Sequence, residues 1–175
     1  MKVVLASKNP HKLVEISAIL KPLDVELVLE SDLGVDVEVE ETGSTFEENS
    51  FLKANAVRKA TGLPALADDS GIAVDALGGA PGVHSARYGD DPALDDWGRL
   101  LLLLKNTEQV PDGQRQAQFV SVITLVYPDG RVIQARGEAH GELLREAHGE
   151  GGFGYDPLFY VPEYECTFGE LAPEV

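Results

Sequence analysis

Two adjacent aspartates, Asp68 and Asp69, stand at the end of the apolar, strand-like run Ala65–Asp69. Ligands of open α/β sheets bind beyond the carboxyl ends of strands. Carboxylates at such a place could coordinate Mg²⁺, which usually takes one or two of them together with waters and phosphates. They could also accept a proton from an attacking water. The alternative is a tight Asp-Asp-Ser-Gly turn, but the position after a buried run favours a functional role.

A second group of polar residues surrounds the expected start of the first helix. Ser7, Asn9 and Lys12 lie around Pro10, a residue that fits the first turn of a helix. Free backbone N–H groups and the helix dipole favour phosphate at such a place, and Lys12 adds a positive charge within one turn. A polar cap beside a solvated lysine is the alternative interpretation.

Adjacent carboxylates also occur in the segment Glu40-Glu41-Thr42-Gly43. Because neighbouring carboxylates repel each other, their presence together suggests a nearby cation. An acidic loop in an acidic protein is the alternative. On the helix expected next, Asn49 and Lys53 are four residues apart and share one face.

Two glycine-rich segments could approach a ligand closely. In Gly149–Gly154, the glycines flank Phe153, on which a flat base could stack; a flexible loop is the alternative. In Gly78–Arg87, the terminal arginine could reach a phosphate, and a structural salt bridge is equally compatible with the sequence. The four histidines show no metal-ligand spacing among themselves.

The elements that must position these residues alternate between strands and helices. The expected strands are Val3–Ala6, Val25–Leu29, the half-exposed Val35–Glu40, Ala65–Asp69, and a hairpin of Gln116–Tyr127 and Arg131–His140. The expected helices are Pro10–Leu20, a helix from the doubled capping signature at Ser44 and Thr45 to about Ala60, and Asp91–Lys105. This mixture predicts an α/β fold with a mixed sheet.

Composition limits the class of partner. The chain has 175 residues, which suits one domain or one domain with two lobes. Its formal net charge of −16 argues against a nucleic-acid polymer but leaves room for one small phosphorylated ligand. The single cysteine, Cys166, fits a reducing compartment. The apolar run after Met1 is too short for a signal peptide, and no run reaches the length of a membrane span, so we expect a cytoplasmic location.

Taken together and in this order, the motifs resemble the inosine triphosphate pyrophosphatase family, whose bacterial members are XTP/dITP diphosphatases. The similarity runs from the N-terminus to about Leu171. Its motifs are Ser7-x-Asn9-x-x-Lys12, Glu41-Thr42-Gly43, Phe46-x-Glu48-Asn49-x-x-x-Lys53-Ala54, Ala67-Asp68-Asp69-Ser70-Gly71, Gly78-Gly79-Ala80-Pro81-Gly82 with Ser85-Ala86-Arg87-Tyr88, and Gly151-Gly152-Phe153-Gly154-Tyr155-Asp156-Pro157.

The resemblance implies an enzyme that removes non-standard purine nucleoside triphosphates (ITP, dITP and XTP) from the nucleotide pool. It would hydrolyse them to the monophosphate and pyrophosphate with Mg²⁺ as cofactor. It further implies a homodimer and an elongated two-lobed α/β fold around a long mixed β-sheet with flanking helices. Residues 1–175 would form a single nucleotide pyrophosphatase domain whose active site lies in the cleft between the lobes.

The resemblance also implies roles for individual residues. Asp69 would be the general base and a metal ligand, and Glu41 would be the second metal ligand. The substrate-binding residues would be Ser7, Lys8, Asn9, Pro10, His11, Lys12, Lys53 and Ser70 at the phosphate end, and Phe153, Gly154, Tyr155 and Asp156 in the base pocket. Local cations and the metal would then neutralise a triphosphate within an acidic protein.

One departure concerns the C-terminus. Family members continue with a lysine and a Ser-His-Arg motif that contact the base, whereas this sequence ends at Val175. We therefore expect altered base selectivity and uncovered apolar surface. The alternatives are a related pyrophosphatase for other modified nucleotides, such as modified pyrimidine triphosphates, and a nucleotide-binding module inactivated by C-terminal truncation.

Overall fold

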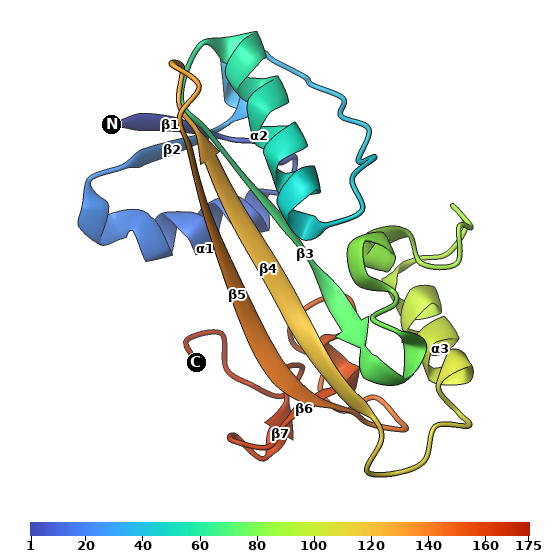
Figure 1. The fold of residues 1–175 in the computed structure, drawn as a ribbon. Helices are drawn as coiled ribbons and strands as arrows, with labels where there is room; N and C mark the ends of the chain where they lie inside the picture. The colour runs from blue at the N-terminus through green and yellow to red at the C-terminus, as the bar shows by residue number, and fades with distance from the viewer. The chain divides into compact units, whose positions relative to one another are not determined.

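The computed structural model describes residues 1–175 and contains one seven-stranded mixed sheet with the strand order β2-β1-β3-β4-β5-β6-β7 (Figure 1). The strands are β1 (Lys2–Leu5), β2 (Glu26–Leu29), β3 (Ala65–Val74), β4 (Gln116–Val126), β5 (Val132–Leu143), β6 (Phe159–Val161) and β7 (Cys166–Thr167). β1 pairs in parallel with β2 and β3, whereas β5, β6 and β7 pair antiparallel in turn. The predicted α/β class with a mixed sheet is confirmed.

Three α-helices and five short 3-10 helices complete the chain. The α-helices are α1 (Pro10–Leu20), α2 (Phe46–Thr61) and α3 (Asp96–Asn106). The 3-10 helices are η1 (Lys21–Leu23), η2 (Glu30–Leu33), η3 (Asp75–Leu77), η4 (Gly82–Arg87) and η5 (Asp156–Leu158). None of the helices combines the length and the apolar character that crossing a membrane requires.

The chain divides into two compact units. Unit 1 comprises Met1–Asp69 and Ser121–Gly137, and unit 2 comprises Ser70–Val120 and Glu138–Val175. Each unit has apolar clusters of its own.

In unit 1, the sheet buries both faces, one under α1 and the other under α2 (Figure 1). Val3 and Leu5 pack with apolar residues of α1, whereas Val4, the residue between them, packs with Val57 of α2. Successive side chains of a strand point to opposite faces, so a strand buried on both sides has an uninterrupted apolar sequence. This is why the predicted strand near the N-terminus is short and wholly apolar.

In unit 2, α3 packs its leucines against the second half of β3. Leu100 and Leu103 share one cluster with Ile72 and Val74, and all four side chains are buried. Aromatic rings extend this cluster, with the Phe119 ring centroid 4.7 Å from that of Phe159 and 5.5 Å from that of Phe168. The first residues of β3 thus serve one core and its last residues another.

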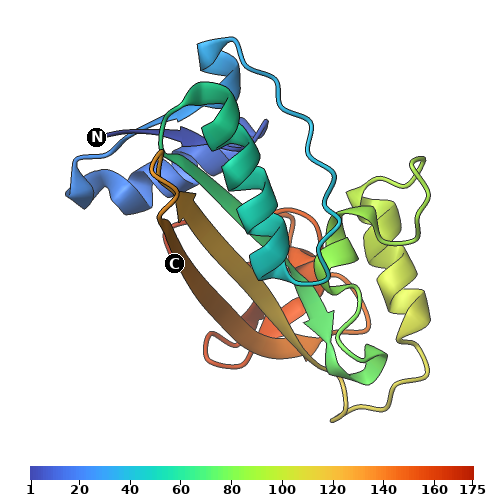
Figure 2. The ribbon, with the colours of Figure 1, turned by 45° about the horizontal axis from the view of Figure 1, so that its top comes forward.

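The prediction of a strand over Val35–Glu40 is wrong. The segment is extended and its valines are turned inward while Asp36, Glu38 and Glu40 are exposed, but it belongs to no strand of the sheet. Figure 2 shows the segment between η2 and α2, drawn in light blue, running alongside α2. Alternation reports which side chains are buried, and here one face of an extended segment packs without a ladder of backbone hydrogen bonds.

Two further boundaries differ from the predictions by five residues each, and the second strand of the hairpin ends at Leu143 rather than His140. The third helix begins at Asp96 rather than Asp91, because Asp95 is the N-cap that accepts from Gly98 N at 2.7 Å, while Asp91 closes a local turn onto Ala93 N at 2.9 Å. The strand predicted to end at Asp69 continues to Val74, so the alternative of a tight turn at Ser70 and Gly71 is also wrong.

Other sequence signals are confirmed. Of the two overlapping capping signatures, Thr45 is the N-cap of α2: its Oγ1 accepts from Glu48 N at 3.1 Å, while Ser44 N donates to the Glu48 carboxylate at 2.8 Å. Gly62, at φ 69°, ends the helix. The hairpin between β4 and β5 closes with Tyr127 N donating to Arg131 O at 2.9 Å.

Candidate functional site

The alternation of β3 sends Asp68 and Asp69 to opposite faces of the sheet. Leu66 packs in the cluster on the α1 side, and Ala65 and Ala67 pack in the clusters on the α2 side. Residues two apart in a strand point to the same face, so Asp68 points to the α1 side like Leu66, and Asp69 points to the α2 side like Ala67. The registered pairing of β3 with β1 stops at Leu66, so both aspartates lie just beyond the end of β1.

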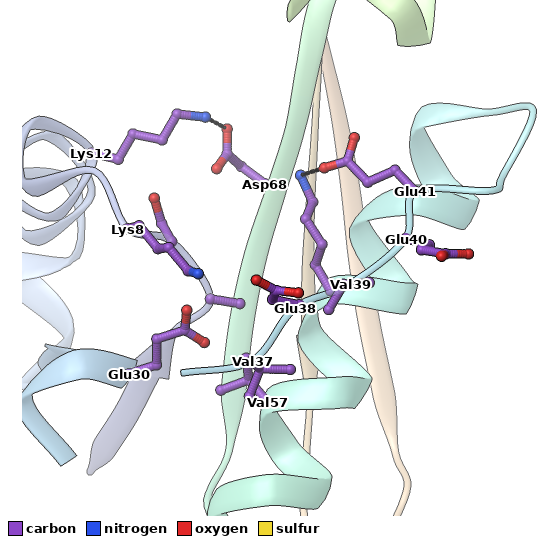
Figure 3. A pocket seen from close by; sticks show the side chains of 13 residues that line it. Lys8, Lys12, Glu30, Val37, Glu38, Val39, Glu40, Glu41, Val57 and Asp68 are labelled. Carbon is purple, nitrogen blue, oxygen red and sulfur yellow. Dashed lines mark hydrogen bonds and ion pairs between the residues drawn. The ribbon is translucent and has the colours of Figure 1, made fainter. Parts of the chain in front are cut away.

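On the α1 face, Lys12 meets Asp68. The Lys12 Nζ donates to Asp68 Oδ2, and the two side chains are mostly buried (Figure 3). Lys12 is therefore not the solvated lysine of the alternative interpretation. The polar cap that this interpretation also included is present: Asn9 Oδ1 accepts from His11 N at 2.9 Å, and Ser7 Oγ accepts from Asn9 N at 3.1 Å.

On the α2 face, one lysine lies between two carboxylates. Lys53 Nζ is 3.1 Å from Asp69 Oδ1 and 3.3 Å from Glu41 Oε1. Burial by itself would lower the pKa of Lys53, but the charges of Asp69 and Glu41 outweigh it and raise that pKa. Lys53 is therefore a fixed cation between the two residues expected to bind metal.

Asp69 is the more constrained of these two carboxylates. Its side chain is buried, and its Oδ2 is buried without a hydrogen-bond partner. Burial raises the pKa of Asp69, and the neighbouring Lys53 offsets this only in part. A buried carboxylate oxygen without a donor is costly unless a ligand satisfies it. Its chemistry fits a divalent cation or a water that is to be deprotonated.

Glu41 is held in place through a clamp between α2 and the segment before it. Asn49 is fully buried, its Oδ1 accepts from Gly43 N at 2.8 Å, and its Nδ2 donates to Gly43 O at 3.4 Å. A Cβ on Gly43 would lie 2.6 Å from that Oδ1, so only glycine fits there. Because Asn49 and Lys53 share one helix face, the same face of α2 fixes the segment that carries Glu41 and presents the lysine that contacts it.

Lys12, Lys53, Glu41 and Asp68 line a pocket of about 700 Å³ within unit 1, with Asp69 next to it behind Lys53 rather than in its lining. Its lining residues are Ala6, Ser7, Lys8, Lys12, Glu30, Val37, Glu38, Val39, Glu40, Glu41, Lys53, Val57 and Asp68. Figure 3 shows Lys12 reaching toward Asp68 from one side and Glu41 lying on the other. Three lysines and five carboxylates lie in the wall, so the pocket offers both positive donors for an anion and hard oxygens for a cation.

From the sequence, Asp68 has only the role that it shares with Asp69 as one of two adjacent carboxylates, and Glu30 has none. Asp68 could have been placed by strand alternation had the strand been expected to continue past Asp69. Glu30 is buried at the start of η2, where burial raises its pKa and the charge of Lys8 opposes that rise in part. Nothing in the sequence around Glu30 indicates that the carboxylate would be enclosed.

The remaining predicted phosphate-end residues are more exposed. Lys8 Nζ pairs with Asp36 Oδ1 at 2.5 Å, with both side chains largely in solvent. Pro10 and His11 are exposed at the first turn of α1. Ser70 is exposed within β3 and belongs to unit 2.

The predicted base-pocket residues all lie in unit 2. Phe153 is 64% exposed, and its backbone N–H donates to Asp156 Oδ2 at 2.9 Å, so the Asp156 carboxylate braces the turn that carries the ring. Gly154 adopts a left-handed conformation at φ 59°. Tyr155 is buried and its hydroxyl donates to Ser85 O at 2.6 Å, which places it in the core of unit 2 beneath the loop.

Other candidates do not assemble into a site. No group of three or more His, Cys, Asp or Glu side chains is arranged to hold a metal ion. A centre built from protein ligands alone is therefore absent, whereas Mg²⁺ commonly uses one or two carboxylates and takes its other ligands from water and phosphate. The pair Glu41 and Asp69 meets that smaller requirement.

The fold and the pocket define an α/β protein in which lysines and carboxylates line a pocket beyond the end of a parallel strand pair. The chain belongs to the Ham1 family, whose sequence model matches residues 3–175. The family membership expected from the motifs is thereby confirmed.

Relatives and solved structures cover almost the whole chain. A dITP/XTP pyrophosphatase of Desulforamulus reducens is 50% identical over 99% of this chain and 86% of its own, and one of Thermus thermophilus is 51% identical over 99% and 83%. A HAM1 protein from Coxiella burnetii superposes with a TM-score of 0.92 at 42% identity, covering 99% of this chain and 88% of that chain.

Proposed function

We propose that this chain is an enzyme that hydrolyses non-standard purine nucleoside triphosphates (dITP, XTP and ITP) to the monophosphate and pyrophosphate. The observation that carries the proposal is the lysine–carboxylate pocket, in which Lys53 lies between Asp69 and Glu41 while Lys12 pairs with Asp68. The names of relatives about 50% identical to it support the same reaction and the same substrate class.

Phosphoryl chemistry of this kind depends mainly on positioning and charge neutralisation. In the proposed mechanism, Lys12 and Lys53 bind the phosphate chain together with the backbone N–H groups at the start of α1. Both lysines are held by partly buried carboxylates, which keep their ammonium groups at the pocket. This arrangement places positive charge locally in a protein of net charge −16.

Asp69 is the proposed base for the attacking water. Its Oδ2 is a buried acceptor without a partner. Burial raises the pKa of Asp69 toward neutral pH, which makes the carboxylate a better proton acceptor. Asp68, on the opposite face of the strand, points to Lys12 instead. The two neighbouring aspartates therefore have different proposed roles, one toward water and one toward the lysine that binds phosphate.

The proposed cofactor is Mg²⁺, held by Glu41 and Asp69. When bound, it would stabilise the negative charge that develops on the phosphate oxygens. The unpartnered Oδ2 of Asp69 and the small number of protein carboxylates fit an ion that shares its coordination sphere with phosphate and water.

The proposed contact to the base is the exposed ring of Phe153, with Gly154 and the Asp156-braced turn beside it. Its glycine neighbours would let backbone groups approach the edge of a stacked purine. A cytoplasmic location and a homodimer are also part of the proposal. Light scattering on the purified chain tests the dimer.

The decisive experiment measures pyrophosphate release with Mg²⁺ on ITP, dITP, XTP, ATP and GTP. We expect turnover of the first three and little turnover of the last two. Equal rates on all five would reject the proposed selectivity, and turnover confined to modified pyrimidine nucleotides would favour a related pyrophosphatase. If ITP binds in calorimetry without pyrophosphate release, the chain is a binding module.

A further inference from the structure

The position of Lys53 bears on how a metal ion can reach the two carboxylates. Its ammonium lies within 3.3 Å of one oxygen of Glu41 and one oxygen of Asp69. Lys53 is only 19% exposed at its side chain, and its stem lies on the α2 face that also carries Asn49 and Val57. Without a metal, the ammonium is therefore the counterion of the carboxylate pair rather than a charge exposed to solvent.

A divalent cation and an ammonium cannot share this place at low cost. An ion bound by Glu41 and Asp69 would lie close to Lys53 Nζ, and two cations at such a distance repel each other even where solvent screens them in part. The unpartnered Oδ2 of Asp69 gives a cation one oxygen that Lys53 does not occupy. The oxygens that Lys53 contacts are Glu41 Oε1 and Asp69 Oδ1, so an ion held by the same two carboxylates would compete with the ammonium for them.

We propose that Lys53 is a displaceable counterion, which a divalent metal must move away from Glu41 and Asp69 and which thereby becomes available to the phosphate chain. This inference rests on the proposed function, because it assigns the metal to the same two carboxylates. Metal and triphosphate then bind cooperatively: the metal releases the lysine, and the anion gives it a new partner. Either ligand alone must break the ion pairs without that compensation.

The pocket provides its own control. Lys12 is a second partly buried lysine that pairs with a β3 aspartate, but the aspartate that it contacts is Asp68, on the other face of the strand. Removing either lysine changes the net charge by the same amount. A general increase in negative potential would strengthen metal binding equally in both variants, whereas displacement of a specific counterion concerns Lys53 alone.

The experiment measures the affinity of Mn²⁺, as a spectroscopic substitute for Mg²⁺, by electron paramagnetic resonance on the full chain without nucleotide. Lys53→Met keeps the apolar stem and removes the charge. We expect it to bind Mn²⁺ roughly tenfold or more tightly than the unmodified chain, with Lys12→Met changing the affinity by much less. Lys53→Gln serves as the second variant if Lys53→Met fails to fold, and circular dichroism checks both.

The inference is overturned if the Lys53 variants bind Mn²⁺ no more tightly than Lys12→Met does. Because no nucleotide is present, this result is independent of pyrophosphate release. If the chain releases no pyrophosphate but the Lys53 variants bind Mn²⁺ more tightly, the proposed function is refuted and the counterion role stands. If the chain releases pyrophosphate but the Lys53 variants bind Mn²⁺ no more tightly, the counterion role is refuted and the proposed function stands.

Discussion

At the scale of single residues, the site combines two lysine–carboxylate contacts that differ in what they leave unsatisfied. Lys12 and Asp68 meet on one face of β3, and Lys53 and Asp69 meet on the other. Asp69 keeps one buried oxygen without a partner, and burial outweighs its lysine in setting its pKa. A group held ionised at a cost to the fold is typical of a functional position.

Asp69→Asn should therefore separate activity from stability. Pyrophosphate release should fall by roughly 10²- to 10⁴-fold, because the proposed proton acceptor is lost. The folded chain should be as stable as the original or more stable at neutral pH, since the raised pKa means that burial of the ionised carboxylate opposes folding. Steady-state assays and thermal unfolding measure the two effects. Asp68→Asn is the matched control, and a marked loss of stability only in Asp69→Asn would contradict this account.

Glu30 provides a test through pH. Burial raises its pKa in the folded state, so the fold binds its proton more tightly than the unfolded chain does. The corresponding stability is present at acidic pH and is lost as the pH rises from the ordinary carboxyl range through the raised pKa. Glu30→Gln should remove this part of the pH dependence and raise stability at pH 7. Urea unfolding at several pH values checks it, and the exposed Glu26→Gln controls for the loss of one charge.

At the scale of elements, α2 connects local folding to the site. Its N-terminal turn carries the cap at Thr45, the next turn carries the Asn49 clamp on Gly43, and Lys53 follows one turn later. A helix that begins at the wrong residue would move both the clamp and the lysine. The start of α2 therefore contributes to the geometry at Glu41 as well as to stability.

Thr45→Ala should destabilise the fold by about 1 kcal/mol, because Glu48 N loses the cap acceptor at 3.1 Å. Ser44→Ala is the matched control: the Ser44 side chain has a longer contact to the Glu48 carboxylate at 3.3 Å, and its shorter contact is made by the backbone, which the substitution keeps. Urea denaturation of both variants measures the difference. Equal losses would show that the two overlapping capping signatures contribute equally.

The same elements show what could and could not be predicted from the sequence. Caps, the Gly62 stop and the hairpin turn are local, so a few residues suffice to indicate them. The alternation over Val35–Glu40 correctly indicates burial on one face of the segment. It does not indicate whether a strand forms, because strand pairing depends on a partner elsewhere in the chain. The contacts of Lys53 with Glu41 and Asp69 join three segments, and no local pattern reports that closeness.

At the scale of the whole molecule, the chain is strongly acidic but gathers three lysines at one pocket. Lys8, Lys12 and Lys53 all line it, in a protein that has 14 basic and 30 acidic residues. Each of these lysines pairs with a carboxylate, but the lining holds three lysines and five acidic residues, so the pocket itself is negative on balance. A small anion would therefore depend on these individual lysines and on a metal ion, where a long polyanion would be repelled by the surface as a whole.

The net charge of −16 also predicts a dependence of stability on salt. Repulsion among surface carboxylates should weaken as the Debye length falls, so the unfolding temperature should rise between about 10 mM and about 200 mM KCl. Exposed pairs such as Arg131 with Asp129 are screened as well, but such pairs contribute little. Calorimetry at pH 7 tests this. Near the sequence isoelectric point of about 4.5, the same addition of salt should have much less effect.

The alternation of β3 has a consequence for how this family can vary in length. The number of residues from Leu66 to Asp69 fixes which helix each aspartate faces. Deleting or inserting a single residue there would exchange the partners, turning the residue that contacts Lys53 toward Lys12. Substitutions in this stretch can be absorbed one at a time, but changes in length can be tolerated only in pairs. The number of residues in this stretch, as much as the identity of its two acids, therefore determines which lysine each aspartate contacts.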